Sequence, residues 1–454
     1  KLAYGSGDLA SNCSYGLVSS FVLLYLTGTL GLDSAIIGSL MLASKVLDGI
    51  SDVIFGTLID RTHSKLGKAR PWMLFGQVGV SLCLFLLFAI PAGSTTMQYI
   101  YFFIVYTALN AVFYTANGIA YSSLVALITK NNNERVQLGS FRFMFAVVTN
   151  IFMGFAVTGM VEKFGSGAAG WRTTALIFAI VGLVVNTISC LAVKELPEEE
   201  LSGNTSEAAE EGKAVAEEKK HGFAETAKIL VHNKYYLMIL AIYIVYYIMS
   251  NLTTGAGVFC ATYYWGDGSL LGQFSMMKMF PAIIALAFAP VLIKKTGSMQ
   301  KVNFWGYAIS SVLGIPMIYF AMQKNLSMFL LFMFIKGVFA GTLSGSLNAL
   351  IAEASGYTTR TTGVHMDGMM YSCSSLGVKV GGGIGTAAVG WLLKLGGFVG
   401  TATVQSESAI RMIFNLYITF PFVIGIIITV LLAFLDVEKA NKKWDAEHKK
   451  EAQA

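Results

Sequence analysis

The chain has 454 residues, of which 55% are hydrophobic and only 13% charged, and its mean hydropathy is +0.63. Roughly 25% of the residues in a soluble domain are charged, so this composition excludes an ordinary soluble protein. The formal net charge of +6 comes from basic residues between apolar segments, which indicates membrane topology and gives no support to nucleic-acid binding.

About twelve segments are long and apolar enough to cross a bilayer, which takes about 20 residues. They form two sets of six, at residues 8–30, 35–58, 71–91, 98–128, 138–161 and 171–193, and at 235–264, 269–293, 302–323, 327–352, 368–395 and 408–435. A polar stretch rich in Glu, Ala and Lys separates the sets. We therefore expect an all-α membrane protein with an N-terminal six-helix bundle, a cytoplasmic linker, a C-terminal six-helix bundle and a cytoplasmic tail, at 1–194, 195–233, 234–436 and 437–454. The linker is expected to carry a short amphipathic helix at 223–231.

Basic residues mark the connections that follow the even-numbered spans: Arg61, Lys65, Lys68, Arg70, Lys130, Arg135, Lys294, Lys295, Lys301 and Arg360. The other connections are short and nearly uncharged. By the positive-inside rule, both termini are expected in the cytoplasm, with the chain in the inner (plasma) membrane. The five cysteines lie within spans and lack metal-ligand spacing, so buried free thiols are expected, with no cofactor. No cleavable signal peptide pattern is present.

The first span presents polar and aromatic residues along one face, at spacings of four, three and four: Asp8, Asn12, Tyr15 and Ser19. The fourth span does the same with Tyr114, Asn117 and Tyr121. Such stripes suit a sugar, because aromatic rings stack on its C–H face and amides bond its hydroxyls. The alternative is hydrogen bonding that only holds helices together. Asp8 is also explained by a position at the cytoplasmic end of its helix.

The second span carries Asp48 and Asp52 four residues apart, on one helix face with Lys45. An acid at the middle of a spanning helix costs at least about 2.5–3.5 kcal/mol, which indicates a functional role. Two neighbouring carboxylates form an oxygen site for a hard monovalent cation. They could instead share a proton, because mutual repulsion raises one pKa. The residues fit both chemistries.

Two further charges within the spans, Arg142 and Lys379, should face a cavity. One interpretation is that they neutralise the aspartates, with help from Lys45. The other is that they bind a substrate carboxylate, which Arg grips with its planar fork. Lys278 and Lys336 also lie within spans, and no neighbour assigns them a role.

Four stretches carry a family resemblance: Tyr4-Gly-Ser-Gly-Asp8 with Asn12, Leu47-Asp48-Gly-Ile-Ser-Asp52, the loop from Asp60-Arg61 through Lys68-Ala-Arg70-Pro-Trp72, and residues 352–368. In this order they resemble the glycoside–pentoside–hexuronide:cation symporters, the family of the melibiose carrier within the major facilitator superfamily. The resemblance implies two six-helix bundles around a central cavity, with alternating access and no enzymatic activity.

Carried over position by position, the resemblance implies a cation site at Asp48 and Asp52. It implies that Arg142 lies beside the sugar and Lys379 near the carboxylates. Together with the polar stripes of the first and fourth spans, the predicted substrate site comprises Asn12, Tyr15, Asn117, Tyr121, Arg142, Ser375 and Lys379. Basic residues of the loop after the second span would latch the cytoplasmic side by pairing with helix-end carbonyls and an acid; the residues concerned are Asp60, Arg61, Lys68 and Arg70. No other metal site is implied.

The chain departs from melibiose-type members at four positions. Asn12 and Asn117 replace aspartates that hold sugar hydroxyls, Tyr121 replaces a tryptophan, and Tyr114 replaces a threonine associated with sodium. We expect a monomeric symporter that couples H⁺ or Na⁺, with the proton favoured, to a glycoside or hexuronide, with the charge balance favouring the hexuronide. The alternatives are a neutral glycoside or pentoside symporter, a lipid carrier on the same fold and, less favoured, a channel.

Overall fold

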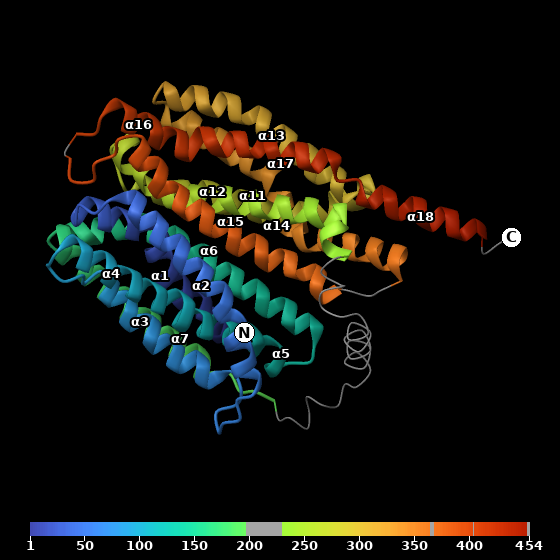
Figure 1. The fold of residues 1–454 in the computed structure, drawn as a ribbon, viewed down its shortest axis with the longest axis horizontal. Coiled ribbons are helices and arrows are strands. Elements are labelled where there is room, and N and C mark those ends of the chain that lie inside the picture. The colour runs from blue at the N-terminus through green and yellow to red at the C-terminus, as the bar shows by residue number, and fades with distance from the viewer. Residues whose placement is uncertain (197–228, 364–366, 403, 452–454) are drawn as a thin grey trace. The chain divides into compact units, whose positions relative to one another are not determined.

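The computed structural model describes residues 1–196, 229–363, 367–402 and 404–451, and every regular element in these ranges is a helix (Figure 1). The all-α fold class expected from the sequence is therefore confirmed. Most of the expected linker, with its amphipathic helix at 223–231, lies outside the described residues.

The helices match the expected spans to within a few residues at most boundaries. The N-terminal set comprises α1 Leu2–Leu24, η1 Tyr25–Thr29, α2 Ser34–Asp60, α3 Arg70–Leu87, α4 Thr95–Thr107, η2 Ala108–Tyr114, α5 Thr115–Ile128, α6 Asn132–Lys163 and α7 Gly167–Leu191. The C-terminal set comprises α11 Lys234–Phe259, η3 Cys260–Trp265, α12 Leu270–Thr296, α13 Met299–Met322, α14 Leu326–Thr362, α15 Asp367–Leu395, α16 Glu407–Phe414, η4 Asn415–Thr419, α17 Phe420–Phe434 and α18 Val437–Glu451.

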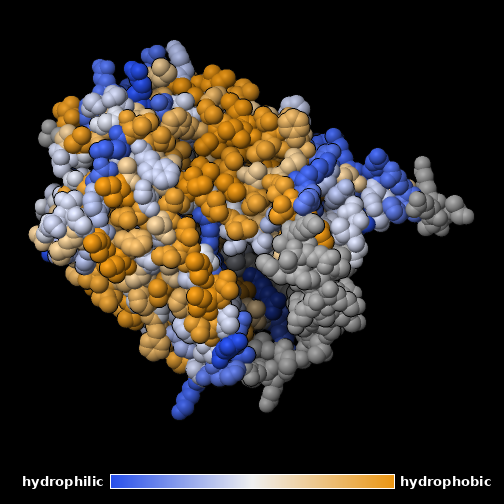
Figure 2. All heavy atoms as spheres, in the orientation of Figure 1, coloured by the Kyte–Doolittle hydropathy of each residue, from blue (hydrophilic) through white to orange (hydrophobic). Residues whose placement is uncertain are grey.

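Eleven helical segments of the described chain are long and apolar enough to cross a membrane. Helix α2, the twelfth expected span, is 27 residues long. It is not among these eleven because it carries the charges of Lys45, Asp48 and Asp52. Large apolar side chains are exposed on the outer helix faces, where Figure 2 shows broad hydrophobic areas. Phe75, for example, is 71% exposed. Lipid is the medium that tolerates such a surface.

The four elements η1 to η4 are π-helical segments, in which the backbone hydrogen bond spans one residue more than in an α-helix. Segment η2 lies between α4 and α5 within one continuous span. Such segments are rare and occur frequently at functional sites. Segment η2 determines the direction in which the side chains after it point, starting with Thr115.

The chain divides into two compact units. The first comprises Lys1–Gly203, Asn251–Met276 and Gly383–Tyr417, and the second comprises Asn204–Ser250, Met277–Gly382 and Ile418–Ala454. The first unit thus contains α1 to α7, η3 and α16, together with parts of α11, α12, α15 and η4.

Within the first unit, glycines allow close backbone contact between helices of the two sequence halves. A β-carbon at Gly38 on α2 would lie 2.7 Å from the carbonyl oxygen of Ala387 on α15, and one at Gly154 on α6 would lie 2.8 Å from the Cα of Gly272 on α12. Beside the first contact, the Lys394 ammonium lies 2.6 Å from the carboxylate of Asp33, which also caps the start of α2. These contacts hold the helix ends of the first unit together.

Each sequence half contains a glutamate that caps the N-terminus of its third span. Glu195, after α7, accepts from the backbone amides of Lys68, Ala69 and Arg70 at 2.7–3.0 Å. Glu438, after α17, accepts from the amides of Met299 and Gln300 at 2.8 and 3.2 Å and from the Ser298 hydroxyl. Each carboxylate satisfies amides that have no partner within the helix. The halves therefore repeat one capping device.

Candidate substrate and cation site

One face of α1 is accessible, whereas most of that helix is buried. The half-buried residues on it include the four of the predicted stripe, Asp8, Asn12, Tyr15 and Ser19, and the residues between them are largely buried. The partly exposed face is therefore the polar one.

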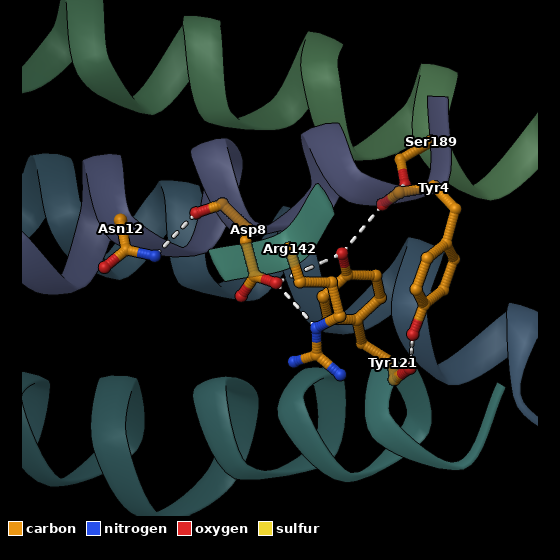
Figure 3. A network of polar contacts seen from close by, with 6 residues as sticks. All are labelled: Tyr4, Asp8, Asn12, Tyr121, Arg142 and Ser189. Carbon is orange, nitrogen blue, oxygen red and sulfur yellow. Dashed lines mark hydrogen bonds and ion pairs between the residues drawn. The ribbon is translucent and has the colours of Figure 1, made fainter. Parts of the chain in front are cut away.

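Asp8 lies at the centre of a polar network that joins four helices (Figure 3). Its Oδ2 accepts a 2.6 Å hydrogen bond from Arg142 Nε on α6, and the Tyr121 hydroxyl lies 3.4 Å from the same oxygen. The Arg142 guanidinium sits 4.2 Å above the Tyr121 ring. The sequence placed Arg142 in the site but did not identify Asp8 as its partner.

Tyr4 and Tyr121 fasten α1 to α5 by two reciprocal bonds. Each hydroxyl donates to the other residue's backbone carbonyl at 2.7 Å, and the Ser189 hydroxyl of α7 also donates to the Tyr4 carbonyl. Tyr121 is only 2% exposed. Its ring supports Arg142, and its hydroxyl is already engaged within the protein.

Asn12 and Asn117 are both occupied by contacts within the bundle. Asn12 Nδ2 donates to the Asp8 carbonyl at 2.7 Å, and its Oδ1 accepts from Asn150 Nδ2 at 2.9 Å. Asn117 is 3% exposed and donates to Gln77 Oε1 at 2.6 Å. The accessible side of α5 runs instead through Gly118 and Ser122.

Asp48 occupies a second polar cluster, between α2 and α5. It is 8% exposed; its Oδ1 accepts from the Thr115 hydroxyl at 2.7 Å, and Lys45 Nζ lies 3.4 Å from its Oδ2. Asp52 is half-buried one turn further along α2. The carboxylate pair that the sequence predicted thus lies on one helix, next to a hydroxyl that the sequence did not predict.

Two tyrosines connect the α1 face to the Asp48 cluster. The rings of Tyr15 and Tyr114 stack with their centroids 5.3 Å apart, and Lys45 Nζ lies 5.7 Å from the Tyr15 ring centroid. The Tyr15 ring therefore lies next to both Tyr114 and the lysine that pairs with Asp48.

Comparison with known proteins identifies the family. The family described as MFS/sugar transport protein matches residues 3–439. The chain belongs to this family. It is 25% identical to the uncharacterized symporter YnaJ of Bacillus subtilis (strain 168), over 97% of this chain and 91% of the relative. It is 26% identical to the isoprimeverose transporter of Lactiplantibacillus pentosus, over 98% and 90%.

The fold is also found in solved transporters. A bacterial homolog of the human lysosomal transporter Spinster, in an inward-facing and unoccupied conformation, superposes with a TM-score of 0.66 at 14% identity, covering 98% of this chain and 96% of that one. The resemblance drawn from the sequence and the major facilitator fold are thereby confirmed. The chain is a multi-pass secondary transporter for sugars and not an enzyme.

Ser375 and Lys379 belong to the second unit, where they lie one turn apart on α15. Ser375 is exposed and Lys379 half-buried. Their assignment to the substrate site remains a prediction from the resemblance.

The basic loop after α2 is fastened within the N-terminal helices. Arg70 Nε donates to the Cys190 carbonyl at 3.1 Å and Nη1 to the Leu66 carbonyl at 3.3 Å. The carboxylate that binds the loop backbone is Glu195, whereas Asp60 is an exposed residue at the end of α2. The gating role predicted for Asp60, Arg61, Lys68 and Arg70 remains a proposal, with Glu195 as an additional member.

Proposed function

We propose that this transporter is a cation-coupled sugar symporter in which Asp48 and Asp52 are the coupling carboxylates. The observation that carries the proposal is the burial of Asp48 in a spanning helix, between a lysine at 3.4 Å and a hydroxyl at 2.7 Å. A charge in such a position is costly and is kept where it moves an ion or a proton. Binding of cation and sugar would then favour each other by the same coupling free energy.

A proton fits the Asp48 environment well. Thr115 Oγ1 lies 2.7 Å from Asp48 Oδ1 and 2.9 Å from the Asn110 carbonyl oxygen. When Asp48 is ionised, the hydroxyl donates to it. When Asp48 is protonated, it can donate to Oγ1, whose own proton then turns to the carbonyl. Both protonation states are hydrogen-bonded, which supports H⁺ over Na⁺ as the coupling ion.

Uptake of the sugar into proteoliposomes tests the coupling role of Asp48 and Asp52. Asp48→Asn and Asp52→Asn should each abolish accumulation against a gradient, while downhill exchange of the sugar continues. Glu447→Gln is the matched control, because it also removes one carboxylate charge but lies on an exposed surface outside the site, 3.8 Å from Lys443. Undiminished accumulation in both variants would refute the assignment.

The driving ion is identified with the same vesicles. An imposed pH gradient in sodium-free buffer should drive uptake, and strict dependence on sodium at constant pH would identify Na⁺ instead. A channel would equilibrate the sugar without accumulating it. Transport of lysolipids in place of sugars would indicate a lipid carrier.

A further inference from the structure

The charge of Arg142 is already balanced. Its Nε lies 2.6 Å from Asp8 Oδ2, and the two side chains are only 25% and 15% exposed. Such a short, partly buried pair is strong because both groups are charged and water is largely excluded. A charge count that omits Asp8 leaves Arg142 free for a substrate carboxylate. With Asp8 included, the N-terminal site has no surplus cation there.

The pair still has unused hydrogen-bonding atoms. Both contacts of the Asp8 carboxylate fall on Oδ2, and the hydrogen bond described for Arg142 uses Nε. The Tyr4 hydroxyl also interacts with the guanidinium and takes up a further N–H group. Asp8 Oδ1 and the remaining N–H groups of Arg142 therefore offer an acceptor beside donors. Two adjacent sugar hydroxyls match this set, because one can donate to Oδ1 while its neighbour accepts from the guanidinium.

The other polar residues near this position are committed elsewhere. Asn12 uses its amide nitrogen and oxygen within the bundle, and the Tyr121 hydroxyl bonds to Tyr4. Asp8 lies one turn from Asn12 on the accessible face of α1. It therefore supplies the carboxylate of this face.

From this geometry we propose that Asp8 contacts the substrate and, by neutralising Arg142, selects uncharged sugars with adjacent hydroxyl groups. The inference rests on the proposed sugar function. It reverses the preference for a hexuronide that the sequence suggested. A substrate carboxylate would meet the like charge of Asp8 and a guanidinium that already has a counter-ion.

Equilibrium binding to the purified full-length protein tests the proposal without requiring coupled transport. The probes are methyl glucosides, galactosides and xylosides of both anomers, together with the corresponding methyl glucuronides and galacturonides. Wild type should bind a neutral glycoside at least about tenfold more tightly than the uronide that differs only at carbon six. Asp8→Asn should weaken binding of the neutral glycoside about tenfold or more. The same variant should strengthen binding of the uronide, because Arg142 is released from Asp8.

The double variant Asp8→Asn/Arg142→Gln identifies the origin of that gain, since it should lose the improved uronide binding. Asp8→Glu, which keeps the negative charge, should still bind neutral glycosides more tightly than uronides. Glu447→Gln, at an exposed position outside the site, should behave as wild type, and size-exclusion profiles show which variants remain folded.

A uronide preference in wild type, or equal weakening of both ligands by Asp8→Asn, would overturn the inference and leave coupling through Asp48 intact. Absence of binding to every probe would count against the sugar function itself and would remove the inference with it.

Discussion

At the residue scale, the hydroxyl of Thr115 is the least expected member of the site. We predict that Thr115→Val lowers proton-driven uptake at least about tenfold, because it removes a hydrogen bond to a buried charged group, an interaction of about 1.5–3 kcal/mol. Thr115→Ser should retain most of the activity, since the donor remains. Initial rates of uptake at several external pH values measure this. Equal rates in the Val and Ser variants would show that the hydroxyl is dispensable.

The sequence could identify the costly charges in the site but not which faces of the helices are open. Asp48 and Arg142 stand out because a charge within a span needs a reason. Asn117 and Tyr121 share a polar stripe with Tyr114, yet they face α3 and α1 in the bundle. A polar side chain can bond a neighbouring helix or a solute, and periodicity alone does not distinguish these partners.

At the element scale, Glu195 and Glu438 stabilise the N-termini of α3 and α13. We predict that Glu195→Gln and Glu438→Gln each lower the thermal unfolding temperature in detergent, because a neutral amide interacts less favourably with the helix dipole. A charge at this position is worth about 0.3–1 kcal/mol. Glu447→Gln is the control, since that carboxylate lies 3.8 Å from Lys443 on an exposed surface. A shift no larger than that of the control would contradict the capping role.

The helices themselves could be predicted nearly completely, because an apolar run of about 20 residues has few alternatives in a membrane. The extension of α14 to Thr362, well past the expected end at 352, carries polar residues and gives no apolar signal. The π-helical segments were also missed. They differ from α-helix by one residue in hydrogen-bond spacing, and the sequence composition hardly changes across them.

At the scale of the whole molecule, we predict that the glycine contacts of the first unit separate and re-form as the access to the site alternates. Leucine at Gly38 and Gly272 should prevent close contact and favour the conformation in which these helix ends are apart, because added side chains would meet backbone or the Phe155 ring. A cysteine in place of Ser39, which bonds Trp391 at 2.9 Å, should then react faster with an impermeant maleimide. Gly159→Leu is the control, since nothing lies within 4 Å of that position.

The Asp33–Lys394 pair beside these contacts should not act as a pH sensor. Partial burial opposes ionisation of Asp33, but hydrogen bonds from Lys394 and from the Ile36 and Ala35 amides outweigh it and hold the pKa of that carboxyl below its ordinary value. A lowered pKa means that the stabilisation is present at neutral pH and is lost only as the pH falls below the usual range of an aspartate. The measurement uses the Asp48→Asn/Asp52→Asn background, which removes the proposed proton-coupling carboxylates. There, maleimide reactivity of the Ser39→Cys variant, corrected for thiol ionisation, should be constant between about pH 5 and 8. A step in that range would assign a titrating group to this end of the helices.

The π-helical segment η2 determines which residue of its span reaches Asp48. A π turn accommodates one extra residue without lengthening the helix, so the side chains after it are turned by about one position around the helix axis. The resemblance places Tyr114 where melibiose-type members have a threonine, but the hydroxyl that reaches Asp48 belongs to the next residue, Thr115. Deleting one residue within 108–113 should rotate this hydroxyl about 100° away from Asp48.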